Sequence, residues 1–176
     1  MTNKIKLGKV GGLNLSAAPS ATAGSVLLWA ALGGLAAGLL DVSPVEALVG
    51  GLICAMLHWL SEYMHQVGHA VAARRTGYPM TGVHFWGVLS TSLYPSDEPA
   101  LPAAIHIRRA LGGPCASLLL ALAAGAVAWL LRPVDETPGW IAAFAFLENL
   151  LVFGLGALLP MGFTDGSTLL EWRGKR

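Results

Sequence analysis

Four long apolar segments constrain this chain more than any other feature of its sequence. They cover roughly residues 22–41, 44–73, 108–131 and 139–159. A helix needs about 20 mostly apolar residues to cross the hydrocarbon core of a bilayer. Lipid offers the backbone no hydrogen-bonding partner, so a crossing segment of this kind must be helical. We therefore predict an α-helical integral membrane protein with about four transmembrane helices.

The composition agrees with a membrane location and excludes one class of partner. Hydrophobic residues make up 55% of the chain and charged residues 12%, whereas about a quarter of a typical soluble domain is charged. The net charge of +1 leaves no basic face for a nucleic acid. We expect the outer faces of the helices to contact membrane lipid. Because no internal repeat or linker divides the chain, residues 1–176 are expected to form a single membrane domain.

The basic residues predict the orientation of the chain. If both termini are cytoplasmic, ten of the eleven Lys and Arg residues lie on the cytoplasmic side, and Arg132 is the exception. The ten are Lys4, Lys6, Lys9, Arg74, Arg75, Arg108, Arg109, Arg173, Lys175 and Arg176. This distribution satisfies the positive-inside rule. We expect both termini to be cytoplasmic, in the plasma or inner membrane of a prokaryote.

The stretch between the second and third spans, residues 77–107, is too poor in apolar runs to cross the membrane again. It is expected to be a cytoplasmic loop. Within it, Val83–Leu89 is rich in β-branched and aromatic residues, which is typical of a short strand or hairpin. Ile5 and Leu7 alternate with lysines near the N-terminus, a second and weaker strand pattern. Small β elements on the cytoplasmic side are therefore expected.

The second span carries polar side chains that a membrane helix does not normally hold: His58, Glu62, His65, Gln66 and His69. Ionisable groups in the hydrocarbon core are costly and by default mark a functional site. The alternative is a polar face that is turned to a water-filled groove or satisfied by its neighbours. His65 and His69 lie one turn apart on one helix face, where two imidazoles can reach one metal ion.

Two further residues bear on the chemistry of this histidine pair. In zinc hydrolases with this spacing, a glutamate follows the first histidine and acts as the general base. Here that position is Gln66, whose amide cannot accept the proton. After the last span, Asp165 precedes Gly166 and is well placed as a third ligand, through oxygen. Its alternative role is the N-cap of a helix over Ser167–Trp172.

Three motifs together resemble those of the site-2 proteases, a family of intramembrane zinc metalloproteases. The family has an H-E-x-G-H helix, a G-P-x-x-N segment in a middle helix and an N-x-x-P-x-x-P-x-D-G turn. The corresponding segments are His65–His69, Gly113–Ser117 and Ala157–Gly166, in the same order and with the same spacing. The resemblance implies a membrane helix bundle with small β elements and a Zn²⁺ ion held by His65, His69 and Asp165. It also implies that this ion lies within the membrane toward the cytoplasm, where substrate helices are unwound and cut.

The chain departs from the family motifs at four positions. The general base is replaced by Gln66, and the asparagine ahead of the first proline, which the family uses in holding the substrate, is replaced by Ala157. The asparagine of the middle segment is Ser117, and the second proline of the turn is Phe163. Several departures together favour natural divergence; an engineered Glu-to-Gln change in a divergent member is the alternative.

Two other carboxylates in the spans are candidate substitutes for the base. Glu62 shares the face of the histidines but lies one turn deeper, about 5–6 Å away along the axis, so it could act only through a water chain. Glu148 lies in the middle of the last span. We predict that His58, Glu62, Glu148 and Asn149 form an interior polar cluster, and we prefer a role in helix packing over one in catalysis.

Three functions are compatible with these patterns. The leading one is regulated intramembrane proteolysis by a zinc metalloprotease of the site-2 type, inactive or strongly impaired because Gln66 replaces the base, with an unwound substrate strand paired to the Val83–Leu89 edge. The second is a non-catalytic pseudoprotease that binds a transmembrane helix of a substrate or partner protein, or serves as a structural subunit of a larger membrane complex. The third and least favoured is a pigment- or haem-binding membrane subunit, since membrane histidines also ligate such cofactors.

Overall fold

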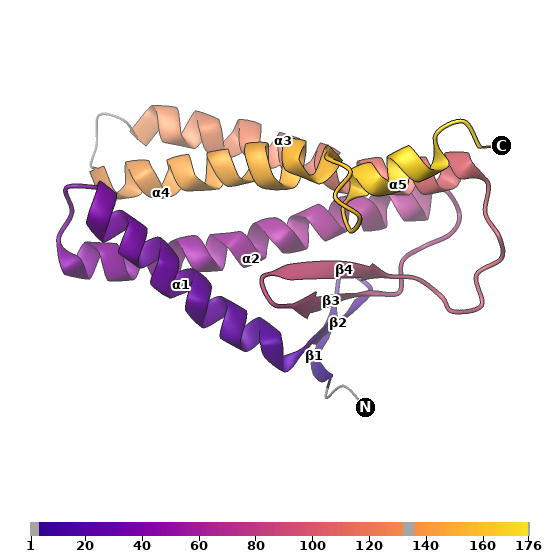
Figure 1. Ribbon diagram of the computed structural model, residues 1–176, viewed down its shortest axis with the longest axis horizontal. Helices are drawn as coiled ribbons and strands as arrows, with labels where there is room; N and C mark the ends of the chain where they lie inside the picture. The colour runs from indigo at the N-terminus through magenta and orange to yellow at the C-terminus, as the bar shows by residue number, and fades with distance from the viewer. Residues whose placement is uncertain (1–3, 132–135, 176) are drawn as a thin grey trace.

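The protein combines a bundle of long helices with a small sheet that packs beside one end of the bundle (Figure 1). The computed structural model describes residues 4–131 and 136–175. In chain order the elements are β1 (Ile5–Val10), β2 (Leu13–Ala17), α1 (Pro19–Leu39), α2 (Pro44–Arg75), β3 (Gly82–Trp86), β4 (Leu89–Leu93), α3 (Ala103–Leu131), α4 (Glu136–Leu147), the π-helix η1 (Glu148–Leu155), the 3₁₀-helix η2 (Gly156–Leu158) and α5 (Asp165–Trp172).

The prediction of about four transmembrane helices is confirmed. Within the described residues, four helical segments are long and apolar enough to cross a membrane: Pro19–Leu39, Pro44–Arg75, Ala103–Leu131 and Thr137–Leu158. The third begins at Ala103 rather than near residue 108. Arg109 lies within this helix, where its side chain is buried and its charge is paired with Glu98.

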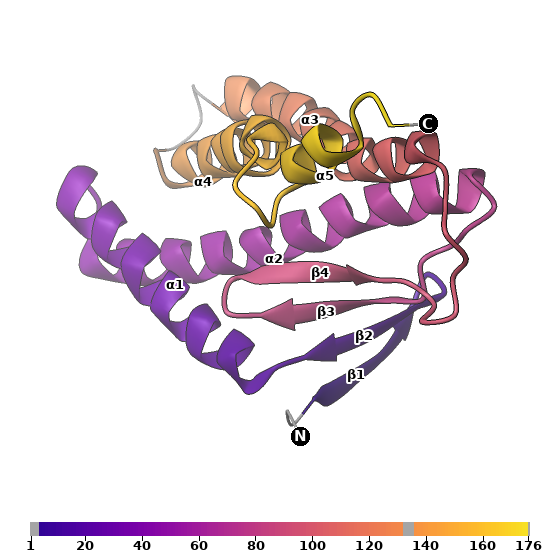
Figure 2. The same ribbon diagram turned by 45° about the vertical axis from the view of Figure 1, so that its right-hand side comes forward.

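Helix α2 is the central element of the bundle and begins with a strong start signal. The Glu46 amide donates to Ser43 Oγ at 3.3 Å, and the Ser43 amide donates to the Glu46 carboxylate at 2.8 Å. This reciprocal pair, followed by Pro44 at the first helical position, is a capping box. At 1.5 Å per residue the helix is about 48 Å long, so it extends beyond a hydrocarbon core of about 30 Å. Figure 2 shows it lying between the sheet and helices α3, α4 and α5.

Glycines bring α2 and α3 into backbone contact. A Cβ atom on Gly68 would lie 2.3 Å from the Gly112 carbonyl oxygen, and one on Gly112 would lie 2.5 Å from the Gly68 oxygen. Only glycine allows this approach, which is the way small residues commonly act in membrane helix packing. The crossing lies beside His65 and His69, so it turns the histidine face of α2 against α3.

The four strands form one sheet in the order β1-β2-β3-β4. β1 pairs with β2 and β3 with β4 in antiparallel fashion, whereas β2 and β3 are parallel. The predicted small β elements are confirmed, and the Val83–Leu89 pattern proves to be part of a hairpin. β2 was not predicted from the sequence. It packs through Leu13 and Ala17 into a core cluster that also contains Ala73 and Val83.

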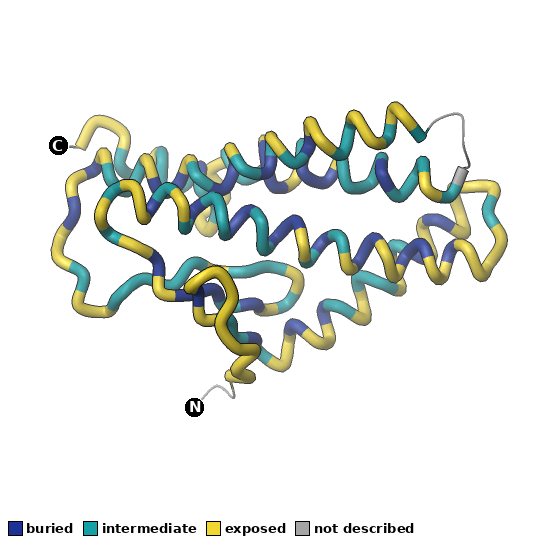
Figure 3. The backbone as a smooth tube through the Cα atoms, turned by 180° about the vertical axis from the view of Figure 1, so that it is seen from behind, coloured by how far each residue is buried: buried dark blue, intermediate teal, exposed yellow. Residues whose placement is uncertain are grey.

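The sheet and α5 lie toward the same end of the bundle, opposite the connection between α1 and α2 (Figures 1 and 2). The outer faces of the helices are largely exposed, and the buried positions face inward (Figure 3). Exposed large apolar side chains on these faces include Leu27, Leu48, Leu119 and Leu151. Such faces suit an integral membrane protein. Two residues used to predict orientation, Arg132 and Arg176, lie outside the described residues.

Candidate metal centre

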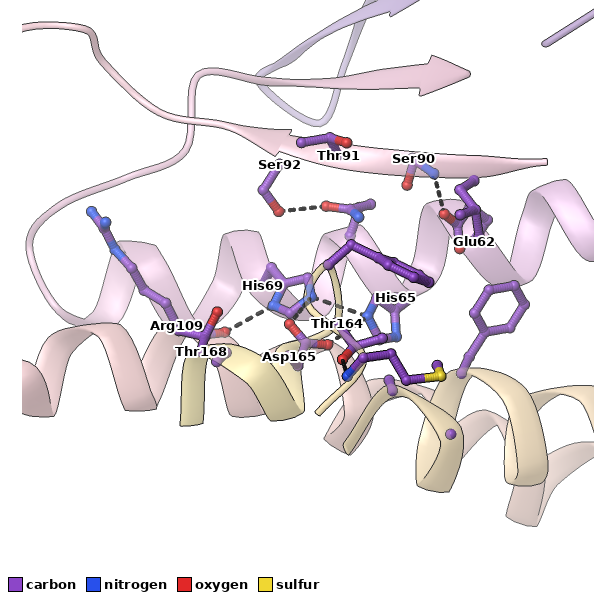
Figure 4. Close-up of a pocket in the computed structure, with 18 of the residues that line it drawn as sticks. Glu62, His65, His69, Ser90, Thr91, Ser92, Arg109, Thr164, Asp165 and Thr168 are labelled. Carbon is purple, nitrogen blue, oxygen red and sulfur yellow. Dashed lines mark hydrogen bonds and ion pairs between the residues drawn. The ribbon is translucent and has the colours of Figure 1, made fainter. Parts of the chain in front are cut away.

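Three side chains from two distant parts of the chain converge on one point (Figure 4). His65 Nε2 lies 3.0 Å from His69 Nε2 and 3.1 Å from Asp165 Oδ2, and His69 Nε2 lies 3.3 Å from Asp165 Oδ1. The two histidines are buried and Asp165 is partly buried. These are the three residues that the sequence patterns single out as metal ligands.

The spacing of these atoms fits a tetrahedral zinc ion. Zinc binds imidazole nitrogen and carboxylate oxygen at about 2.0–2.2 Å, so two ligand atoms of a tetrahedral site are about 3.3 Å apart. The three observed separations of 3.0, 3.1 and 3.3 Å agree with that value. Three protein ligands also leave a fourth position of the tetrahedron for water or substrate, as in catalytic zinc sites.

Contacts behind the imidazoles direct the Nε2 atoms toward this point. His69 Nδ1 donates to the carbonyl oxygen of Arg109 at 2.8 Å, so its Nε2 carries the free lone pair of a neutral imidazole. His65 Nδ1 lies 2.9 Å from the hydroxyl oxygen of Ser117. Outer contacts of this kind are usual for metal-ligating histidines. The serine in place of the family's asparagine therefore contacts a candidate ligand directly.

Gly113 of α3 leaves room for both imidazoles. A Cβ atom at this position would lie 2.3 Å from His69 Nε2 and 2.4 Å from His65 Nε2. Both distances are far below van der Waals contact, and both atoms are the metal-facing nitrogens. A side chain on Gly113 would therefore occupy the candidate centre itself.

Asp165 is the first residue of α5, and its carboxylate points at the histidines. The helix begins two residues earlier than expected, and its N-cap is Thr164, so the alternative of Asp165 as the N-cap is wrong. Burial raises the pKa of the Asp165 carboxyl, but the neighbouring imidazoles of His65 and His69 bring the pKa below its ordinary value. The group is therefore ionised at neutral pH, as a metal ligand must be.

The position of α5 is fixed at its far end by an aromatic stack. The rings of His106 in α3 and Trp172 in α5 are parallel within 6°, with centroids 4.0 Å apart. This contact holds α5 against the start of α3. It therefore helps to keep Asp165 opposite the histidines of α2.

Gln66 lies beside the candidate ligands but turns its amide toward the sheet. Ser92 Oγ in β4 donates to Gln66 Oε1 at 2.6 Å. The side chain is buried. The residue at the general-base position is thus held in place by a neutral hydrogen bond.

A cavity of about 900 Å³ opens in front of the centre. Its walls come from α2, β4, the start of α3 and the segment that leads into α5. Ala157 and Phe163, two of the departures from the family motifs, both line it. Ala157 therefore faces the site without a polar side-chain atom.

The predicted interior cluster of His58, Glu62, Glu148 and Asn149 is divided into three separate contacts. His58 Nδ1 lies 2.7 Å from Glu148 Oε1. The Asn149 amide donates to Ser61 Oγ at 2.8 Å. The Glu62 carboxylate instead accepts a hydrogen bond from the backbone amide of Ser90 in β4. The four residues are buried, but Glu62 faces the sheet and the cavity, not Glu148.

Several residues of the site gave no usable signal in the sequence. The carbonyl of Arg109 is a backbone group, and a sequence pattern does not indicate which carbonyl will meet a histidine. Ser92 lies in a strand whose pairing was not predicted. Glu98 and Tyr94, at the far end of the cavity, pack around the Arg109 guanidinium, which Glu98 binds at 2.9 and 2.5 Å.

Four membrane-length helices, a sheet at one end and a buried His-His-Asp group define the class of this protein, an integral membrane protein with a candidate metal centre. Known proteins agree with this description. No family model matches the chain. However, 98% of the chain aligns, at 31% identity over 190 positions, with a protein named "Putative zinc metalloprotease Rip3" from two strains of Mycobacterium tuberculosis. The aligned region covers 45% of that relative, so the chain spans about half its length.

A solved structure shares the fold. The Site-2 Protease from Methanocaldococcus jannaschii superposes on 95% of this chain and 69% of its own, with a TM-score of 0.63 and 15% sequence identity. The chain is thus similar to a zinc metalloprotease over nearly its whole length and has the fold of a site-2 protease. The resemblance expected from its three motifs is supported by these comparisons, and the expected fold is confirmed.

Proposed function

We propose that this chain is a site-2-type intramembrane metalloprotease that binds Zn²⁺ through His65, His69 and Asp165 and hydrolyses peptide bonds very slowly. The metal assignment is supported by the donor set, two neutral imidazoles and one carboxylate, which is typical of catalytic zinc. When bound, Zn²⁺ would supply Lewis-acid polarisation of a substrate carbonyl and of water.

The slow rate follows from one observation, the amide of Gln66 beside the candidate centre. An amide oxygen cannot take up the proton that a glutamate would accept during attack by water. A positioned general base contributes about 10²–10⁴-fold to a rate. Ser92 keeps the Gln66 side chain on the sheet side of the cavity, and the chain offers no carboxylate at that position.

The proposed substrate is an unwound segment of a transmembrane helix that binds as an extended strand. The expectation that it pairs with the Val83–Leu89 edge needs correction, because β3 already has a strand on each side. The outer strand next to β3 is β4, Leu89–Leu93, and Leu89 to Ser92 line the cavity. Strand addition at an open sheet edge is a common mode of peptide recognition.

A second candidate function is a pseudoprotease that binds membrane helices without cutting them. It is favoured by Ala157, which faces the cavity without a donor for the substrate where the family has asparagine. A pigment- or haem-binding role has less support, since it assigns no part to the carboxylate of Asp165 at 3.1 Å from His65.

We also propose that both termini lie in the cytoplasm, in the plasma or inner membrane of a prokaryote. The support is the clustering of basic residues at one end of the bundle. Lys4, Lys9, Arg74 and Arg173 all belong to segments at the sheet end (Figure 1). This is the arrangement that the positive-inside rule associates with the cytoplasm.

The test of this function is the substitution Gln66→Glu, assayed on a model transmembrane substrate in detergent. We expect the cleavage rate to rise by about 10²–10⁴-fold, because the substitution restores a proton acceptor. The double variant that also carries His65→Ala should lose the gain. Cleavage by the unchanged chain as fast as by Gln66→Glu would contradict the proposal. A Gln66→Glu variant that binds zinc without cleaving would favour the pseudoprotease.

A further inference from the structure

Three polar side chains of α2 hold the edge of strand β4 over the candidate centre. They come from successive turns of the helix and meet alternate positions of the hairpin. The contacts join His58 to Val88, Glu62 to Ser90 and Gln66 to Ser92. Four helical residues advance about 6 Å along α2, and two strand residues advance about 6.7 Å. The spacing of the three side chains along α2 therefore matches the spacing of alternate residues along the hairpin, so each side chain lies opposite its partner.

The contact of Glu62 differs from the other two because it occupies a backbone donor of the strand edge. In an antiparallel pair, alternate residues direct both N–H and C=O away from the partner strand. Ser90 is paired with Phe85 of β3, yet its N–H bonds Glu62. Ser90, and by the same alternation Ser92, therefore turn their backbone groups outward, toward α2 and the cavity.

The outward N–H of Ser90 is the group that an added strand would use. β4 is an outer strand of the sheet, and Glu62, Ser90 and Ser92 all line the same cavity as His65 and Asp165. Figure 4 shows Glu62 reaching Ser90 from the helix below the strand. Because Glu62 already accepts from this N–H, a peptide carbonyl must displace the Glu62 oxygen before it can pair with Ser90.

We infer that Glu62 is an autoinhibitory contact that blocks the substrate edge of β4. An extended segment pairs with β4 only after the Glu62 carboxylate has left the Ser90 amide. His58 and Gln66 hold the hairpin on either side of this point, so the strand stays over the centre when Glu62 moves. This inference rests on the proposed function, because it takes β4 as the edge where the substrate binds.

The test measures binding of a fluorescein-labelled, Val- and Thr-rich octapeptide to the detergent-purified full chain. Glu62→Ala frees the Ser90 amide, and we expect it to bind the peptide about tenfold more tightly than the unchanged chain, or more. Glu62→Gln keeps an acceptor oxygen and should stay near the unchanged chain. Glu171→Gln, an exposed position outside the cavity, is the matched control and should change nothing.

Two further measurements separate strand pairing from other effects. Ser90→Pro removes the outward N–H without touching the bonds to β3, which proline tolerates at a sheet edge. Placed in the Glu62→Ala background, it should abolish the gain, as should N-methylation of alternate amides in the peptide. Equal or weaker binding by Glu62→Ala, or a gain that survives Ser90→Pro, would overturn the inference. Zinc content of the same samples tests the proposed function separately, since Glu62 is not a ligand.

Discussion

The metal-facing nitrogens of His65 and His69 leave no room for a side chain on Gly113. The spacing of the two histidines along α2 brings them to one face, but the space between them and α3 depends on this glycine. The residue is therefore as necessary to the candidate centre as the ligands. Its role is visible only when the two helices are packed together.

Gly113→Ala should reduce zinc binding at least tenfold, because the added methyl group would lie 2.3–2.4 Å from both Nε2 atoms and overpacking forces side chains out of position. The check is zinc content of the purified protein together with its helical circular dichroism. Gly34→Ala, where nothing lies within 4 Å of the new atom, is the control. Full zinc content in Gly113→Ala would show that the ion does not lie between these residues.

The ligand residues were predictable because each belongs to a local pattern. His65 and His69 follow the helical repeat, and Asp165 follows the last span at a motif position. The contacts that orient them were less predictable. Ser117 stood at a motif position, so its closeness to His65 could be expected, whereas the Arg109 carbonyl that meets His69 depends on how α3 is set against α2. The sequence placed Glu62 on the helix face of the histidines. Its contact with Ser90 depends on the register of the hairpin, which the sequence did not predict.

At the level of the elements, an ion pair fastens the segment after β4 to the start of α3. Arg109 donates to Glu98 and to the carbonyl of Tyr78. Its guanidinium also lies 4.2 Å from the ring centre of Tyr94. We call these contacts of Arg109 with Glu98, Tyr78 and Tyr94 the clamp. Because the Arg109 carbonyl orients His69, the clamp joins the segment after β4 to the candidate centre.

The clamp should weaken in acid. The hydrogen bonds from Arg109 hold the pKa of the Glu98 carboxyl below its ordinary value. Its contribution to stability is therefore complete above the pKa of an unfolded glutamate, about 4.3, and is lost as the pH falls through the lower, folded pKa. Glu98→Gln should lower the unfolding free energy by about 1.5–3 kcal/mol at neutral pH and reduce the loss of stability below about pH 4.3. Thermal unfolding in detergent from pH 3 to pH 7 measures both; identical curves would exclude the clamp.

The helices were easier to predict than the strands. A run of about 20 apolar residues identifies a membrane helix by itself, and all four were found. β2 is five residues long and pairs with strands on both sides, so its stability comes from partners far along the chain. The change of the last span from α-helix to the π-helix η1 and then to the 3₁₀-helix η2 likewise has no local signal in the sequence. Ala157 was identified as a site residue only by its place in the family motif.

The whole molecule combines a membrane bundle, a sheet beside one end of it and a buried candidate centre between them. Residues separated by about a hundred positions meet there, since α2 supplies the histidines and α5 the aspartate. The chain matches about half the length of its relative from Mycobacterium tuberculosis. Activity and substrates of the family therefore apply to this chain as proposals.

The most direct test of the central claim is the metal content of the detergent-purified chain by elemental analysis, compared with that of Asp165→Ala. The convergence of two imidazoles and one carboxylate predicts about one zinc per chain, lost in Asp165→Ala and unchanged in Gln66→Glu. The same low zinc content in the unchanged chain and in Asp165→Ala would contradict the account.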